Sequence, residues 1–93
     1  MIRRVELSSS ARKHLKRTPR YIVENLAAWA DEVETRGLGE ARKVPDYHDE
    51  PLHGERRGQR CIRLSRSYRA IYAVKSEGIA QFVLIEEITK HAY

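Results

Sequence analysis

The spacing of hydrophobic positions changes along the chain, from a helical repeat in the first half to strand-like runs in the second. One stripe of large apolar residues recurs every three or four positions: Ile22, Leu26, Trp29 and Val33. Such spacing places them on a single face of a helix. The helix is predicted to start after Thr18-Pro19, because threonine can accept a free amide hydrogen bond and proline presets the first turn. Gly37 and Gly39 are expected to end it.

A short strand and a shorter helix are predicted before this helix. Val5 and Leu7 lie in a loosely alternating stretch over residues 2–7, which favours a strand. One of the serines at 8–10 can cap a helix over residues 11–17, in which Ala11 and Leu15 share a face.

The second half predicts a loop followed by three strands. Residues 42–58 are polar and contain Pro45 and Pro51, so a loop with at most a short strand is expected there. Residues 60–64, 68–75 and 80–88 are rich in branched and aromatic side chains and are separated by short turns, which predicts an antiparallel meander. The fold class is therefore α+β: an N-terminal strand, two helices, then a meander, giving a small twisted sheet with the helices on one face.

Composition narrows the class of protein. A chain of 93 residues can close one core, so residues 1–93 are expected to form a single domain. The apolar runs are too short to cross a bilayer, and residues 1–6 do not resemble a secretory signal, so we expect the cytoplasm. Cys61 is the only cysteine, which excludes an internal disulfide and makes a structural metal unexpected. The formal net charge of +5 favours a polyanionic partner such as nucleic acid or an acidic protein.

Three residues have the chemistry needed to act on a phosphodiester. Glu50 is a carboxylate near a basic stretch and can accept a proton, although a solvated or ion-paired glutamate is the alternative. Arg69 offers a planar fork for phosphoryl oxygens, with a structural ion pair as its alternative. Arg63 should lie near Arg69 across the turn at 65–67. Two like charges at such a short separation favour a bound anion.

Further polar residues are candidates for binding or proton transfer. Four more arginines could supply affinity for a nucleic-acid backbone, although a solvated basic face explains them equally well: Arg56, Arg57, Arg60 and Arg66. At the chain end, the His91 imidazole can exchange a proton and the Tyr93 phenol can donate a hydrogen bond, with a frayed terminus as the alternative. No role is assigned to His14, His48 or His53.

The element order, Glu50-Pro51-Leu52, the run at 69–74 and the closing His91-x-Tyr93 resemble the RelE/ParE toxin superfamily, closest to its YoeB branch. The resemblance implies a RelE-like fold and the toxin of a type II toxin–antitoxin system. Its activity would be a ribosome-dependent mRNA endonuclease, in which a ribose 2′-hydroxyl attacks the adjacent phosphate without a metal or other cofactor. The resemblance implies Glu50 as the base and Arg69 as the phosphate-stabilising cation, with His91 and Tyr93 as further catalytic residues.

One departure from the YoeB pattern concerns the chain end. The branch's histidine and tyrosine are adjacent, whereas Ala92 separates them here, so the sequence leaves open whether His91 or Tyr93 is catalytic.

The resemblance also implies partners. These are a cognate antitoxin that covers the basic cleft and a ribosome carrying mRNA in its A site. Operator DNA would be reached only through the antitoxin complex, no membrane is involved, and dimerisation stays open. Two alternatives remain: a ParE-like DNA gyrase inhibitor without nuclease activity, and a basic RNA-binding or autoregulatory module.

Overall fold

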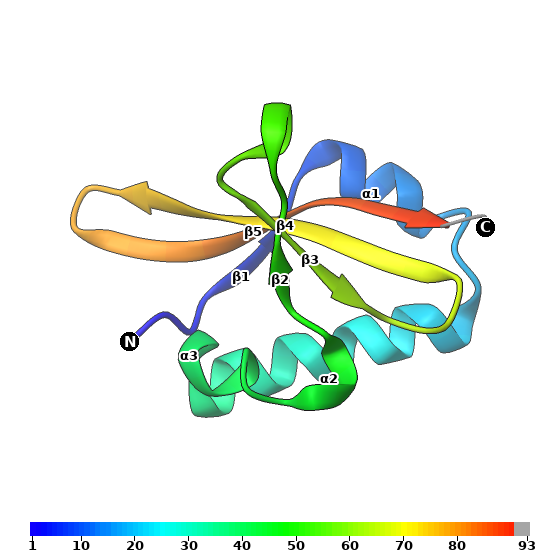
Figure 1. Ribbon diagram of the computed structural model, residues 1–93, viewed down its shortest axis with the longest axis horizontal. Coiled ribbons are helices and arrows are strands. Elements are labelled where there is room, and N and C mark those ends of the chain that lie inside the picture. The colour runs from blue at the N-terminus through cyan, green and yellow to red at the C-terminus, as the bar shows by residue number, and fades with distance from the viewer. Residues whose placement is uncertain (91–93) are drawn as a thin grey trace.

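Residues 1–90, which the computed structural model describes, form a five-stranded mixed sheet with helices packed against one face (Figure 1). The elements are β1 (Val5–Leu7), α1 (Ser9–Leu15), α2 (Arg20–Arg36), α3 (Leu38–Ala41), η1 (Pro45–Tyr47), β2 (Glu50–Pro51), η2 (Gly54–Arg56), β3 (Gln59–Arg63), β4 (Tyr68–Glu77) and β5 (Ala80–Lys90). The strand order is β1-β5-β4-β3-β2. The predicted α+β fold and antiparallel meander are confirmed, while β1 pairs with β5 in parallel.

The start of α2 differs from its prediction. Thr18 does not cap this helix; Pro19 is the N-cap residue, and no side chain accepts a capping hydrogen bond there. The Thr18 hydroxyl instead donates to the carbonyl of His14 at 2.7 Å. Threonine therefore stabilises the end of α1 instead of the beginning of α2.

The predicted apolar stripe of α2 forms the centre of the core. All four of its members are buried: Ile22, Leu26, Trp29 and Val33. The Trp29 ring packs against Tyr72 of β4, with ring centroids 5.1 Å apart and planes inclined by 44°. Because aromatic pairs of this kind add to the free energy gained by area burial, this contact is a main link between helix and sheet.

Helix α1 closes the outer edge of β5. The Ser8 hydroxyl accepts from the Ala11 amide and donates to the Glu86 carbonyl, each at 3.0 Å. At the other end of α1, His14 Nδ1 accepts a hydrogen bond from the Ile88 amide at 3.1 Å. Side chains at the two ends of α1 thus form hydrogen bonds with backbone groups of β5 that lie past the last residue paired with the short strand β1.

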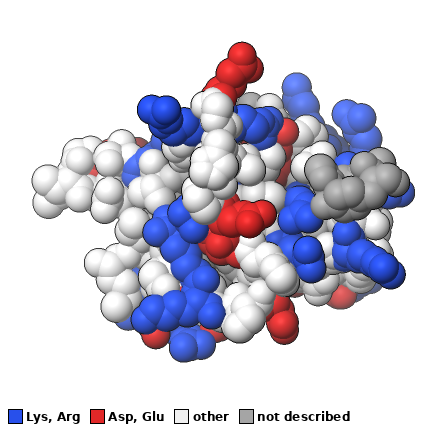
Figure 2. Space-filling model, viewed as in Figure 1, with Lys and Arg blue, Asp and Glu red and all other residues white. Residues whose placement is uncertain are grey.

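A buried carboxylate fixes the position of β2. The Asp49 side chain has 0% exposure; its Oδ1 accepts from Arg60 Nε at 2.6 Å, and its Oδ2 accepts from the Tyr72 hydroxyl at 2.5 Å. Arg42 Nε donates to the same hydroxyl at 3.3 Å. Since a buried carboxylate without partners is strongly destabilising, these bonds hold the chain just before Glu50. Figure 2 shows acidic atoms between groups of Lys and Arg at the centre of this view, where β2 lies in Figure 1.

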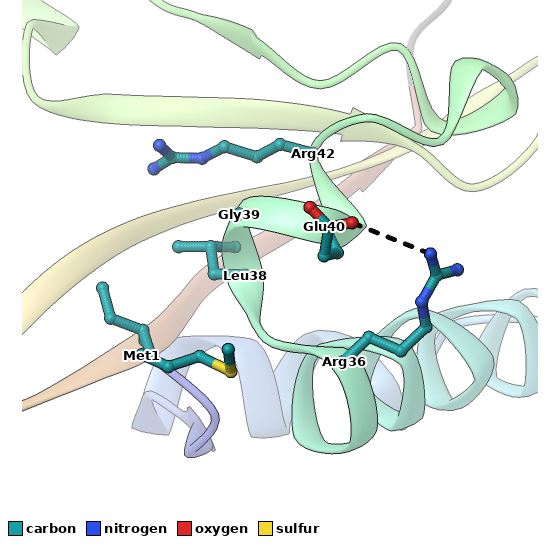
Figure 3. A pocket seen from close by; sticks show the side chains of 7 residues that line it. Met1, Arg36, Leu38, Gly39, Glu40 and Arg42 are labelled. Carbon is teal, nitrogen blue, oxygen red and sulfur yellow. Dashed lines mark ion pairs between the residues drawn. The ribbon is translucent and has the colours of Figure 1, made fainter.

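The turn between α2 and α3 depends on Gly37, which ends α2 as predicted. Its φ of 89° and ψ of 154° lie in a region that is essentially limited to glycine, and its amide donates to the Val33 carbonyl at 2.8 Å. Figure 3 shows Met1 beside a hollow of about 430 Å³ next to this turn, with the Arg36–Glu40 ion pair (4.0 Å) in the same lining. The other predicted stop, Gly39, instead lies inside the unpredicted helix α3.

Gly37→Ala is expected to lower the free energy of unfolding by about 1–3 kcal/mol. The added Cβ disfavours the observed φ and would lie 2.6 Å from Met1 Cγ. Gly39→Ala is the matched control, because a Cβ there meets no atom within 4 Å; its effect should be within about 0.5 kcal/mol or stabilising. Urea unfolding measures both, and an equal loss in the two variants would contradict this account.

Stability at alkaline pH should depend on Tyr72. Burial, with a further contribution from its hydrogen bond to Asp49, raises the pKa of Tyr72 from 10.0 to about 12. The stability gained from the neutral phenol is therefore complete below about pH 10 and lost as the pH rises toward 12. Tyr72→Phe cannot ionise, so its unfolding free energy should fall less across this range than that of the wild type. Parallel pH profiles would rule out this linkage.

Candidate functional site

The sheet face opposite the helices carries the main candidate residues. Side chains alternate between the faces of a strand, and Ile62, Ala70 and Tyr72 belong to the helix-side core. Their neighbours therefore point away from the helices. The strand register places one row across this free face: Glu50, Cys61, Ile71 and Glu87. The next row contains Arg63, Arg69 and Thr89.

Arg63 and Arg69 lie directly opposite each other on β3 and β4, as the sequence predicted. Two guanidinium groups on one face of an antiparallel pair repel each other unless an anion or an acidic side chain lies between them. Within the described residues, Arg63 Nε is a buried donor without a hydrogen-bond acceptor. The pair is thus suited to an oxyanion with several acceptor atoms.

Cys61 separates Glu50 from Arg69 on this face. Burial raises the pKa of the Cys61 thiol; the Arg69 guanidinium, hydrogen-bonded to the sulfur, opposes this rise, and the Glu50 carboxylate adds to it. A thiol whose pKa is raised is a poor nucleophile. Cys61 is therefore a packing residue and a contact for Arg69.

Glu50 begins β2 and is exposed. Among residues 1–90 its carboxylate forms no ion pair. Its position is set by the preceding Asp49, whose buried side chain points to the core. Glu50 is consequently an accessible carboxylate on a fixed backbone.

Glu87 is a residue of this face that the sequence analysis missed. Its carboxylate oxygen lies 2.5 Å from Arg56 Nη2. This ion pair connects η2 to β5 across the sheet. A register shift between Ile71 and Tyr72 brings both Glu86 and Glu87 to this side, where Glu86 accepts a hydrogen bond from Gln59. Strict alternation would have assigned Glu87 to the same side as the buried Ile85, so no local signal in the sequence identifies it.

The other predicted residues are dispersed. Arg60 lies on the helix side of β3 and binds Asp49, away from Arg63 and Arg69. Arg57 and Arg66 are exposed. The two predicted residues of the chain end, His91 and Tyr93, lie outside the described residues.

The described residues give no sign of a metal site or a membrane span. Within residues 1–90 there is no group of three or more His, Cys, Asp or Glu side chains that could hold a metal ion. No helix in the same range is long and apolar enough to span a bilayer.

Comparisons with known proteins identify the fold. No family model and no curated protein matches the sequence. Among solved structures, the YoeB/ParE toxin from Agrobacterium tumefaciens superposes with a TM-score of 0.65 at 20% identity, covering 96% of this chain and 99% of that one. YafQ from E. coli strain BL21(DE3) gives a TM-score of 0.71 at 18% identity, covering 95% of this chain and 92% of that one.

A third structure, the archaeal RelE–RelB complex from Pyrococcus horikoshii, gives a TM-score of 0.70 at 21% identity and covers 99% of this chain and 98% of the matched chain. All three alignments span nearly the whole length of both proteins, although identity is low. The TM-scores and the near-complete coverage show that this chain has the RelE/ParE-like toxin fold.

Proposed function

We propose that this protein is the toxin of a type II toxin–antitoxin system and an endoribonuclease that cuts mRNA on the ribosome. The observation that carries the proposal is the facing pair Arg63 and Arg69 on the same sheet face as the exposed carboxylate of Glu50. Likeness to toxins that were crystallised with an antitoxin, such as YafQ with DinJ, supports the same assignment.

In the proposed reaction Glu50 accepts the proton of a ribose 2′-hydroxyl. The resulting oxygen attacks the adjacent phosphorus, and the bond from phosphorus to the 5′-oxygen breaks. The products are a 2′,3′-cyclic phosphate and a 5′-hydroxyl end, and no metal takes part. Arg69 and Arg63 stabilise the charge that develops on the phosphoryl oxygens, which is where fixed donors contribute most to catalysis.

The departing 5′-oxygen needs a proton, and we assign its delivery to the chain end. His91 is suited to this task because imidazole exchanges protons near neutral pH, and Tyr93 can donate a hydrogen bond. The exposed Arg57 and Arg66 would bind the RNA backbone. Arg56 forms an ion pair with Glu87 and would exchange that partner for RNA. Arg60 is assigned to the structure because it is held by Asp49.

The proposed partners follow from the same surface. A cognate antitoxin would inhibit the toxin by covering the basic free face, and the ribosome would present mRNA in its A site. The RelE–RelB complex of Pyrococcus horikoshii is a structural precedent for such pairing. Operator DNA would be contacted only through the antitoxin.

The test is to map the 5′ ends of mRNA in a translation reaction supplied with each variant. Glu50→Gln should lower the cleavage rate by about 10²–10⁴-fold, because it removes the general base. Arg69→Gln should also abolish most cleavage, because it removes a cation that stabilises the transition state. Glu55→Gln is the control for Glu50, since this exposed carboxylate of η2 lies close by in sequence, and it should leave the rate unchanged.

Thermal unfolding of each variant separates loss of chemistry from loss of fold. If Glu50→Gln cleaves mRNA as fast as the wild type, Glu50 is not part of the mechanism. Translation arrest without new ends, or growth arrest accompanied by DNA damage, would contradict the nuclease proposal and favour a gyrase inhibitor.

A further inference from the structure

A basic hollow of about 190 Å³ lies where β4 begins and β5 ends, next to the turn after α1. Its lining consists of His14, Arg17, Thr18, Tyr68, Ile88 and Lys90. Figure 1 shows the end of β5 and the connection from α1 to α2 at this same end of the molecule. Segments far apart in the sequence therefore contribute to one depression.

The lining carries positive charge that no carboxylate among residues 1–90 neutralises. Within residues 1–90, neither Arg17 nor Lys90 forms an ion pair, and the lining of the hollow contains no carboxylate. The neighbouring hollow that shares His14 differs, because it is lined by Glu86 and Glu87. The basic hollow thus contains two cations and no carboxylate, so an anion would prefer it to the neighbouring hollow.

The remaining polar groups of the basic hollow are mainly donors. His14 Nδ1 accepts from the Ile88 amide, so the neutral ring carries its proton on Nε2 and donates there. The Thr18 hydroxyl is already used by the His14 carbonyl, whereas the Tyr68 phenol can donate. Two cations and two neutral donors match the acceptor oxygens of a phosphate group.

The hollow is close to the candidate active site in the register. Tyr68 pairs with Lys90, and the next pair along the two strands is Arg69 with Thr89. Consecutive residues of a strand face opposite sides, so the hollow lies just around the end of the sheet from Arg69. Figure 2 shows Lys and Arg side chains gathered at this end of the molecule.

We propose that this hollow binds a phosphodiester group of single-stranded RNA that flanks the nucleotide being cut, held by Arg17, Lys90 and Tyr68. The identity of the ligand as RNA rests on the proposed function, while the preference for a phosphate rests on the lining alone. The role of the hollow is to position RNA that runs from Arg69 over the end of the sheet.

The first experiment measures binding of a decaribonucleotide with 2′-O-methyl groups throughout, which cannot be cut because it has no free 2′-hydroxyl. Arg17→Gln and Lys90→Gln should each raise its dissociation constant about 3- to 10-fold at moderate salt and reduce the slope of log K against log salt by about 0.7. Arg3→Gln and Lys43→Gln remove the same charge elsewhere and should change binding less than about 2-fold. Equal weakening in all four variants would show an effect of net charge and overturn the proposal.

The second experiment places the ligand. Backbone amide resonances of Thr18 and Ile88 should shift when the methylated RNA or pyrophosphate is added to the full chain, and Arg17→Gln should suppress both shifts. Shifts with pyrophosphate but none with RNA would overturn the proposal, because the hollow would then be a site for small anions only.

Failure of the proposed function has a different signature. If methylated RNA binds in the hollow but mRNA stays intact in translation reactions, the binding site is supported and the nuclease proposal is contradicted. If mRNA is cleaved but Arg17→Gln and Lys90→Gln bind RNA as tightly as the wild type, the nuclease proposal is supported and the binding site is contradicted.

Discussion

The paired, buried carboxylate of Asp49 is the constraint on which the arrangement of the site depends. Removing a charged oxygen from water is costly, and the cost is offset only when both oxygens receive hydrogen bonds in good geometry. Arg60 and the Tyr72 hydroxyl meet this requirement from two different strands. Because Tyr72 also packs against Trp29, the position of Asp49 is coupled to the central contact between helix and sheet.

That coupling gives neighbouring residues separate tasks. Asp49 is directed to the core, and Glu50, the next residue, begins β2 and is exposed. The same division occurs on β3, where Arg60 neutralises the buried carboxylate and Arg63 faces Arg69. Alternation along a strand therefore separates a structural charge network from the candidate site, which lies on the opposite side of the same sheet.

Closure of the β5 edge has a comparable double effect. Ser8 and His14 satisfy backbone groups that a short β1 leaves without a strand neighbour, which protects the edge from pairing with other chains. The same contacts bring the turn after α1, with Arg17, next to Lys90. The hydrogen bonds that stabilise the β5 edge thus also place positive charge at the end of the sheet nearest Arg63 and Arg69.

Local patterns in the sequence determined the elements and part of the site. The helical stripe, the end of α2 at Gly37 and the meander follow from periodicity and short turns, which involve residues close in the chain. The approach of Arg63 to Arg69 is of this kind, because the short turn between the two strands leaves little choice of register.

Only the tertiary structure decided the contacts between distant segments. The parallel pairing of β1, the bonds of Asp49 to Arg60 and Tyr72, and the bulge that turns Glu87 toward Arg56 depend on how segments far apart pack together. A charged residue in a sequence has many partners of suitable sign, and periodicity does not choose among them. Packing chose them, because burial leaves one arrangement in which each buried charge of this network has its hydrogen bonds.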